Sequence, residues 1–428
     1  MTRNSNSDRL NENVLDAVSR FVAWLGRYGE TSYDHQSFFA GPVGRTAKAL
    51  YYRSPLLGTL AVAPMIACEA FLPSARKLFW KAQRFPIADA HYAMGFANLF
   101  QALGQEEYYQ RAVHFLEVLQ QTRSAGFEHY AWGYPFDWVT RNGTIKACTP
   151  LITTVPYCYE AFSQVYKIDG DARWREVMLS VARHALLDYH DVVTSPTAAS
   201  CSYTPDRKDK CGVINASAYR SFLLTKAAQD FSDEQFRKVA EKNLNFVLES
   251  QNSNGSWFYS TDGVRDFVDH FHTCFVMKAL VKTEQLTGSV ACRKAIERGT
   301  AYYVKNLFDA NGLPAPFSKA PRLTVYRREL YDCAECVNLA VLLSGRFAEL
   351  DRILSGLIAD LLARWQKPDG SFRARELLVG WDNVPMHRWA QSQIFRSLSL
   401  FLLHNATAPR ENSSGAAVPP LAFQSVNS

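Results

Sequence analysis

The stretch Leu99-Phe100-Gln101-Ala102-Leu103-Gly104 joins an apolar helical run to a glycine, and stretches of this kind recur along the chain. Glycine is favoured just after a helix because it adopts the left-handed backbone conformation without strain. The equivalent glycines Gly170, Gly288 and Gly345 follow Gly104 at steps of 66, 118 and 57 residues. Because 118 is twice 59, we expect a further helix end near residue 231, within the polar segment 229–233.

The units that these turns delimit are helical. Apolar residues at i, i+3, i+4 and i+7 recur from Val14 almost to Leu403, the sixth unit ends near His404, and strand patterns are scarce. Open stacked repeats usually have periods of about 20–50 residues, whereas six longer hairpins can bury both helix layers by closing on themselves. We therefore predict an all-α fold, an (α/α)6 toroid of six helical hairpins, in which the inner helices begin at one mouth of the ring.

A single domain is expected over residues 13–405. The chain has 428 residues, of which 47% are hydrophobic and 21% charged, as in an ordinary globular protein. Length alone permits two or three domains, but the repeat unites them in one ring. We predict flexible segments at 1–12 and at 406–428, where a Ser-Ser-Gly run begins at Ser413.

Charge and cysteine content exclude some classes of protein. The net charge of +6 is modest and includes no Lys/Arg block, so a nucleic-acid partner is not expected. The nine cysteines are odd in number and irregularly spaced, which favours reduced thiols. Residues 1–10 are polar and lack the apolar core of a signal peptide. These features predict a cytoplasmic location.

Residues 55–84 form an apolar and basic segment. Pro55 to Pro73 is apolar over almost 19 residues, and the basic residues that follow are Arg76, Lys77, Lys81 and Arg84. A membrane span needs about 20 apolar residues, and Glu69 and Pro64 interrupt this one. We expect a helix packed against the fold, with peripheral contact at the inner membrane as the alternative, in which the basic residues meet lipid head groups.

The predicted inner helices begin with polar residues near positions 89, 153, 215, 269, 332 and 387. Asp, Thr and Asn are good N-caps, which accounts for single positions. Capping does not account for the presence of four of the ten histidines at these helix starts. Converging helix N-termini also favour anionic ligands. The candidates at these starts are Asp89, His91, Thr153, Asn215, Asp269, His270, His272, Asp332, His387, Arg388 and Trp389.

Aromatic residues crowd the loops that precede these helices. Residues 126–138 contain six aromatic rings, among them Trp132 and Tyr134, together with Asp137. Trp257 follows the turn Asn254-Gly255-Ser256, and Tyr203 lies in the equivalent loop between them. Sugar C–H faces stack on aromatic rings while sugar hydroxyls bind polar side chains, so these loops are typical of a glycan-binding cleft. The alternative is that the rings only pack the loops over the end of the toroid.

Five motifs lie at these helix starts and loops: FPIADAHY at 85–92, WGYPFDW at 132–138, TPLITTVPY at 149–157, DHFHT at 269–273 and RWAQ at 388–391. Together they resemble a bacterial family found with capsule and exopolysaccharide biosynthesis genes. The likeness extends from about Tyr33 to Leu403. It implies a role in polysaccharide biosynthesis. Where this chain has Cys274, the family has a glycine, which argues against a required thiol.

Members of that family are often described as δ-aminolevulinic acid dehydratases. That enzyme is a TIM barrel with a pair of active-site lysines, and this sequence has neither βα alternation nor a lysine-centred motif. The predicted architecture is more similar to glycoside hydrolases, polysaccharide lyases, N-acylglucosamine 2-epimerases and the helical domain of glucuronyl C5-epimerase. This likeness is one of fold only.

The leading hypothesis is an enzyme that acts on a glycan or a lipid-linked sugar by epimerisation, elimination or hydrolysis. Each reaction needs a general acid and a general base. The catalytic candidates are Asp269, His270 and His272 for proton transfer, Tyr134 and Tyr203 as alternative acids, and Asp89, Asp332 and Glu335 for a hydrolase carboxylate pair. Arg388 and His91 are expected to bind a uronate carboxylate. The full substrate-binding set is Asp89, His91, Trp132, Asp137, Thr153, Asn215, Trp257, His387, Arg388 and Trp389.

Two other classes of function stay open. The first is a non-catalytic glycan-binding or scaffold component of a polysaccharide assembly complex. The second is a zinc-dependent toroid enzyme, whose ligands would come from His91, His270, His272, His387 and the pair Cys333 and Cys336. Only one such cysteine pair exists and a four-ligand spacing is absent, so the leading hypothesis includes no metal and no cofactor.

Overall fold

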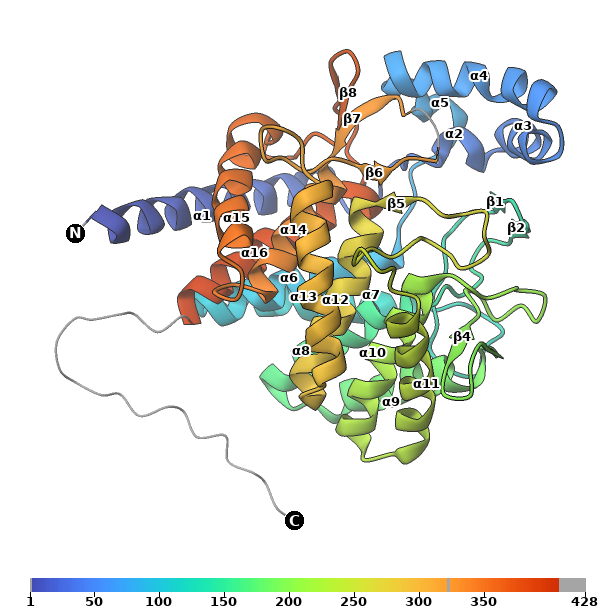
Figure 1. Cartoon of the computed structure of the whole chain (residues 1–428). Helices are drawn as coiled ribbons and strands as arrows, with labels where there is room; N and C mark the ends of the chain where they lie inside the picture. The colour runs from blue at the N-terminus through green and yellow to red at the C-terminus, as the bar shows by residue number, and fades with distance from the viewer. Residues whose placement is uncertain (1, 322–323, 408–428) are drawn as a thin grey trace.

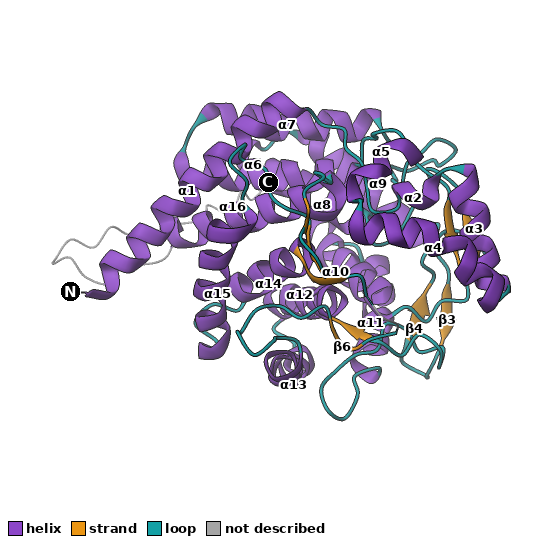
Figure 2. Cartoon of the chain, turned by 90° about the horizontal axis from the view of Figure 1, so that it is seen from above, coloured by secondary structure: helices purple, strands orange, loops and turns teal. Residues whose placement is uncertain are grey.

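The computed structural model describes residues 2–321 and 324–407, and within these ranges the helices form two layers around one axis (Figures 1 and 2). Each inner helix packs against the next along the chain, and the last packs against the first, which closes the ring. The inner helices of the described chain are α6 (Pro86–Leu103), α8 (Val155–Asp169), α10 (Ile214–Phe231), α12 (His270–Thr287), α14 (Leu330–Leu342) and α16 (Ser392–Thr407).

The outer layer within the same ranges is α1 (Thr2–Tyr28), α7 (Glu106–Gln121), α9 (Ala172–Leu187), α11 (Glu234–Glu249), α13 (Val290–Asn306) and α15 (Ala348–Asp360). Helix α1 packs against α16, so the two ends of the described chain together complete the sixth hairpin. The (α/α)6 toroid predicted from the sequence is confirmed. Helix α1 begins at Thr2, within the segment 1–12 for which the sequence predicts flexibility, and most of the predicted tail lies outside the described residues.

Of the four glycines predicted at helix ends, three directly end inner helices, whereas Gly345, with φ of 73°, lies three residues beyond the end of α14 at Leu342. Gly104, Gly170 and Gly288 end α6, α8 and α12 in the left-handed conformation, with φ of 69°, 69° and 70°. Helix α10 ends at Phe231, and Ser232 takes the left-handed position there with φ of 53°. The turn expected near residue 231 is therefore present, without a glycine.

Short antiparallel strands connect the hairpins and were scarcely visible in the sequence pattern. They are β1 (Trp138–Thr140), β2 (Gly143–Ile145), β3 (Asp191–Val193), β4 (Ala199–Cys201), β5 (Val268–Asp269), β6 (Phe317–Lys319), β7 (Tyr326–Glu329), β8 (Arg375–Leu377) and β9 (Trp381–Asp382). The first six pair in sequence order as two-stranded ribbons, and the last three form one sheet in the order β7-β8-β9. In the first ribbon Trp138 lies opposite Ile145. Two π-helical turns, η2 (Leu361–Trp365) and η3 (His387–Gln391), adjoin α15 and α16.

An insertion of short helices follows α1 and stands beside the ring (Figure 1). It consists of α2 (Ser37–Ala40), α3 (Pro42–Arg53), α4 (Pro55–Phe71), the 3-10 turn η1 (Pro73–Ala75) and α5 (Arg76–Phe79). Phe38, Ala47, Val62 and Met65 form a separate small core within it. Two ion pairs, Arg76 with Asp382, which is fully buried, and Arg375 with the partly buried Glu69, hold the insertion to the β7-β8-β9 sheet.

Helix α4 has a packed side and an exposed side, so the expectation of a helix packed against the fold holds for one side only. No helix of the described chain is both long and apolar enough to cross a membrane by itself. The pair Leu56–Phe71 and Pro73–Phe79 reaches that length and composition only together, with a bend of 118° between them.

Two loops repeat one turn of sequence Asn/Asp-Gly-Ser-aromatic. Gly255 and Gly370 have φ of 93° and 97°, and a Cβ on either glycine would lie 2.4 Å and 2.3 Å from the backbone oxygens of Arg298 and Arg20 in outer helices. The following serine, Ser256 or Ser371, donates its backbone N–H and its hydroxyl to the side chain that precedes the glycine. Both conformation and close approach therefore require glycine at these turns.

We expect Gly255→Ala to destabilise the protein more than Gly288→Ala. Both residues have positive φ, which costs alanine about 1–2 kcal/mol, but a Cβ at Gly288 meets no atom within 4 Å. At Gly255 the clash with the Arg298 carbonyl adds about 1–3 kcal/mol. Urea unfolding of the two variants measures the difference. Equal stabilities would contradict the close approach.

Candidate active site

Asp269 and His272 form a hydrogen-bonded dyad at the start of α12. Strand β5 pairs with β6 and places Asp269 as the N-cap, where its Oδ1 accepts the backbone N–H of His272 at 3.1 Å. Its Oδ2 lies 2.6 Å from Nδ1 of the His272 ring. The backbone oxygen of Asp269 accepts the Thr273 hydroxyl at 2.7 Å. Because Nδ1 donates to the carboxylate, Nε2 of His272 is the basic nitrogen of the ring, and no described residue bonds to it.

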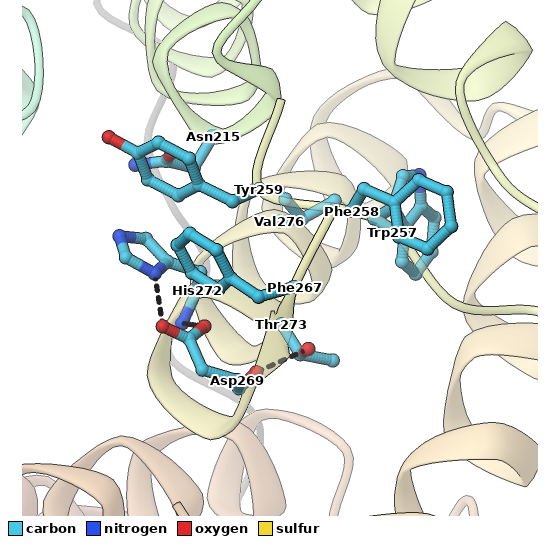
Figure 3. A pocket seen from close by; sticks show the side chains of 9 residues that line it. All are labelled: Asn215, Trp257, Phe258, Tyr259, Phe267, Asp269, His272, Thr273 and Val276. Atoms are coloured by element: carbon cyan, nitrogen blue, oxygen red, sulfur yellow. Dashed lines mark hydrogen bonds and ion pairs between the residues drawn. The ribbon is translucent and has the colours of Figure 1, made fainter. Parts of the chain in front are cut away.

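A pocket opens beside this dyad (Figure 3). It is lined by Asn215, Trp257, Phe258, Tyr259, Phe267, Asp269, His272, Thr273 and Val276. The His272 ring stands against Tyr259, with ring centres 4.7 Å apart at 68°, and is partly exposed. Asn215 is buried, and its Oδ1 has no hydrogen-bond partner among the described residues. The pocket therefore presents one basic nitrogen and one unused amide oxygen between aromatic rings.

The pocket is small. Its empty space is about 220 Å³ with the open solvent at its entrance included, and the space that the protein encloses is no larger than about one water molecule. It can admit only a small group such as a hydroxyl, so the remainder of any larger ligand must lie on the surrounding surface.

That surface is an aromatic and basic cluster that adjoins the pocket through Phe271. The ring of Phe271 lies 4.3 Å from that of His272 and 5.5 Å from that of Trp389. Trp389 stacks on Tyr331 with ring centres 4.6 Å apart at 7°. We call Phe271, Tyr331, Trp389, Arg388 and Tyr134 the mouth cluster.

Arg388 is the charged member of the mouth cluster. Its Nε and one Nη donate to the two oxygens of Asp34 at 2.9 and 2.7 Å, and its guanidinium lies 4.4 Å from the ring centre of Tyr134. Although burial opposes it, Arg388 lowers the pKa of Asp34 to about 2, so the carboxyl stays ionised. His35 adjoins the pair and lies 4.3 Å from the Trp389 ring. The guanidinium that was expected to bind a uronate carboxylate is therefore already paired with the Asp34 carboxylate.

The predicted acids Tyr134 and Tyr203 both lie at the mouth. The Tyr203 hydroxyl is 3.2 Å from that of Thr153, and the Trp138 ring, 6.2 Å from Tyr203, joins it to Tyr134. Burial raises the pKa of Tyr203 well above its usual value, so this hydroxyl is a proton donor and not a phenolate. Asp137 lies further out and pairs with Arg45 at 3.3 Å.

His270 and His387 do not serve as predicted. Nδ1 of His270 donates to the carbonyls of Leu307 and Ala315, at 3.1 and 3.2 Å, and its Nε2 accepts the Tyr303 hydroxyl at 2.6 Å. His387 is bound in the same manner, with Nε2 on the Gly29 carbonyl at 3.0 Å and Nδ1 on the Tyr92 hydroxyl at 2.6 Å. Both rings are buried, and burial lowers the pKa of each to about 4. As neutral imidazoles, both rings connect the start of an inner helix to neighbouring segments by hydrogen bonds.

We expect the stability difference between wild type and His387→Gln to narrow in acid. Burial lowers the pKa of His387 from 6.5 to about 4. The contribution of the neutral imidazole to the free energy of unfolding is therefore complete above pH 6.5 and is lost as pH falls toward 4. At about 1.4 kcal/mol per pKa unit, the difference should shrink by about 3 kcal/mol. Denaturant unfolding from pH 7 to 4 measures it. A difference that does not change with pH would show that His387 titrates normally.

Trp132 and Trp257 are structural rather than open sugar platforms. Both are buried, and each indole N–H donates to a backbone carbonyl of the preceding outer helix, Leu119 at 2.8 Å and Val247 at 2.9 Å. Only Trp257 also borders the pocket. The glycan-stacking role predicted for Trp132 is thus not supported, because no face of its ring is accessible.

The predicted carboxylate pair is not assembled. Asp89 accepts both of its hydrogen bonds from Nε of Arg84, at 3.0 and 3.1 Å, and burial raises its pKa to about 7. Asp332 is buried, and burial together with the nearby Glu329 and Asp269 carboxylates raises its pKa well above the usual value, although Arg375 and the Phe271 backbone oppose the rise. Glu335 lies deeper and pairs with Lys278 and Arg396. These acids occupy separate environments, which does not suit a pair flanking one glycosidic bond.

One buried side chain from each inner helix meets at the axis of the ring. These residues, here called the axial layer, are His91, Tyr157, Tyr219, Lys278, Glu335 and Arg396. Tyr157 is central, with its hydroxyl 2.6 Å from that of Tyr219 and 3.4 Å from the Lys278 ammonium, and its ring 4.4 Å from the His91 ring. Arg396 lies 3.5 Å from Glu335. His91 therefore belongs to this layer and does not join Arg388 in a carboxylate site.

The ligand set of the zinc alternative is likewise dispersed. Both nitrogens of His270 and of His387 are engaged, and His91 lies in the axial layer. In residues 2–321 and 324–407, no group of three or more His, Cys, Asp or Glu side chains has the arrangement of a metal site. The structure pairs none of the nine cysteines, all of which lie in its described part.

Neither a protein-family model nor a curated protein matches this sequence. Among solved structures, cellobiose 2-epimerase from Bacillus thermoamylovorans B4167 is similar, with a TM-score of 0.60 at 9% identity over 75% of this chain and 88% of that chain. A GH76 α-mannanase of Bacteroides thetaiotaomicron has a TM-score of 0.58 at 10% identity over 84% and 98%. A glycosyl hydrolase of family 88 from Bacteroides vulgatus has 0.52 at 12% over 74% and 91%. At these identities the likeness shows the (α/α)6 fold alone.

The site also contains residues that sequence reasoning missed. Asp34 and His35 reach Arg388 and Trp389 across more than 350 positions of sequence, and no local pattern links them. Tyr259 and Phe267 flank His272; the sequence marked aromatic residues just after the turn at 254–256, but not Phe267. Phe271 lies within the DHFHT motif, but nothing in the sequence distinguished it from an ordinary core phenylalanine.

Proposed function

We propose that this protein is a carbohydrate-active enzyme that moves a proton at a sugar carbon, with His272 as the base. The observation that carries the proposal is the Asp269–His272 dyad, whose free Nε2 borders an aromatic pocket. A carboxylate behind a histidine fixes the tautomer and stabilises the imidazolium that forms when the ring accepts a proton. The (α/α)6 fold, which a cellobiose 2-epimerase and several glycan-cleaving enzymes share, supports a sugar as the substrate.

Epimerisation or elimination is favoured over hydrolysis. Both reactions begin when a base removes a proton from carbon, and then require an acid or a leaving group on the other side. Tyr203, a protonated hydroxyl at the mouth, is the candidate acid. Hydrolysis requires two carboxyl groups across one bond, and Asp89, Asp332 and Glu335 lie in separate buried environments.

The substrate is a glycan segment that lies across the mouth cluster, with one small group of the reacting sugar at the pocket. Trp389 offers a partly exposed ring that the buried Tyr331 ring supports from behind, and Arg388 carries a guanidinium Nη1 that no described residue binds. A uronate carboxylate beside the reacting carbon would acidify its C–H bond, which suits a single histidine base. We further propose that the glycan belongs to polysaccharide biosynthesis, in keeping with the motif resemblance.

Incubation of the purified protein with uronate-containing oligosaccharides in deuterated water tests the proposal. Exchange of deuterium at the carbon beside the carboxylate is expected, with or without an unsaturated product that absorbs in the ultraviolet. Reducing-end release without exchange would replace the proposal by hydrolysis. Binding without either would favour a glycan-binding or scaffold component.

A further inference from the structure

Half of the exposed large hydrophobic side chains lie on the insertion. Of the sixteen in the described chain, eight belong to residues 37–84, about a tenth of the sequence. Those on and after α4 are Leu56, Leu57, Leu60, Phe71, Leu72 and Leu78. A cluster of this kind on a protein surface marks an interaction site, whereas single exposed hydrophobic residues are ordinary.

The exposed side of α4 is a continuous apolar stripe. Leu56, Leu60 and Phe71 are 82%, 70% and 68% exposed, and Ala63, Pro64 and Ala67 fill the helical positions between them. The opposite side carries Val62 and Met65 into the small core of the insertion. The single acid of the helix, Glu69, is turned toward the ring, where it pairs with Arg375. The helix therefore shows no charge on the side that faces solvent.

The same segment carries the whole net charge of the protein. Residues 37–84 contain seven of the 47 Lys and Arg residues and one of the 41 Asp and Glu residues, which leaves forty of each in the rest of the chain. Arg53 ends α3 and is separated from α4 by one residue, and Lys77 and Lys81 follow α4. These three are exposed and have no acidic partner among the described residues. Basic residues thus stand at both ends of the apolar stripe.

We propose that α4, η1 and α5 dock on an anionic lipid bilayer. An apolar helix face inserts to the depth of the lipid head groups, and flanking basic side chains bind the negative surface. The 118° bend between the two helical segments suits a structure that lies on the bilayer and does not cross it. A second copy of this chain, docked through its own insertion, would not neutralise the positive charge of this segment, because that insertion is equally basic.

The docked orientation places the candidate site next to the lipid. The residues just before α2, Asp34 and His35, contact Arg388 and Trp389, and Arg45 of α3 contacts Asp137, three residues after Tyr134 of the mouth cluster. A sugar carried on a lipid would then reach the mouth cluster without leaving the membrane. The docking itself does not depend on which reaction takes place in the pocket.

Sedimentation of the full chain with phosphatidylcholine vesicles, with and without phosphatidylglycerol, tests the proposal. Wild type should bind the anionic vesicles and be released by salt. The variant Leu56→Ser/Leu60→Ser/Phe71→Ser should lose binding. The variant Arg53→Gln/Lys77→Gln/Lys81→Gln should bind anionic vesicles more weakly by about fivefold for each basic residue removed. Thermal melting checks that the variants fold.

The matched control is the triple variant Leu187→Ser/Val193→Ser/Val290→Ser. It replaces three exposed hydrophobic residues on α9, β3 and α13, away from the insertion. This control should bind vesicles as wild type does. Absence of wild-type binding to anionic vesicles, or full binding by the apolar variant, would overturn the proposal. So would a wild-type dimer that the apolar variant dissociates, since that would assign the stripe to a second copy. None of these outcomes bears on deuterium exchange, so docking and catalysis can fail separately.

Discussion

Asp269→Asn should lower the rate of deuterium exchange by about 10²–10⁴-fold, the contribution usual for a general base, while the protein stays folded. Asparagine is as good an N-cap as aspartate, so the start of α12 is retained. Its amide, however, can donate to Nδ1 of His272, which would move the ring proton to Nε2. The nitrogen that faces the pocket would then no longer be basic.

His272→Gln should lower the exchange rate to a similar degree, and the double variant should be no slower than either single one, because the two residues act as a unit. His404→Gln, at the far end of inner helix α16, is the matched control and should leave the rate unchanged. Unfolding in urea establishes that each variant is intact. Activity that survives in both Asp269→Asn and His272→Gln would remove the dyad from the mechanism.

Glu335→Gln should destabilise the protein by about 3–5 kcal/mol, the cost of breaking a buried ion pair by removing one partner. Glu335 is fully buried and pairs with both Lys278 and Arg396, so its loss leaves two cations without a counter-charge. Burial already lowers the pKa of Lys278 to about 8 even beside this carboxylate. Without it the ammonium should release its proton at lower pH, so the loss of stability should shrink as pH rises toward 8.

Lys278→Met is the companion variant. It leaves Glu335 paired with Arg396, and its side chain fills nearly the same volume, so the expected loss is smaller than that of Glu335→Gln. Urea unfolding at pH 6 and pH 8 measures both. Equal losses in the two variants, unchanged by pH, would mean that the axial layer is stabilised by packing and not by charge.

The fold could be predicted because the helix ends repeat. Glycine after each apolar run gave the hairpin period, and Gly104, Gly170 and Gly288 do end inner helices. Even the unit without a glycine was found by its spacing, since Ser232 adopts the left-handed conformation at the expected place. The contact of α1 with α16 was not predicted, because it joins residues at the two ends of the described chain.

The site could be predicted to the level of the helix start but not of the side chain. His270 and His272 are two positions apart on a helix and therefore point to different sides, one into the core and one into the pocket. Sequence alone did not say which. Likewise Trp132 looks like a sugar platform until the structure shows its indole bonded to Leu119. Whether such a side chain is structural or lines the pocket depends on its contacts with Tyr303, Leu307 and other residues far away in sequence.

The axial layer makes the toroid a cup and not a tube. Side chains from every inner helix meet across the axis, and all are buried, so no polymer can be threaded through the ring. If the proposed substrate is a polymer, it must arrive and depart on the same side, and only a chain end, or a segment bent over the rim, can reach the bottom. After each turnover such a polymer would have to lift off or slide along the rim before its next residue could enter.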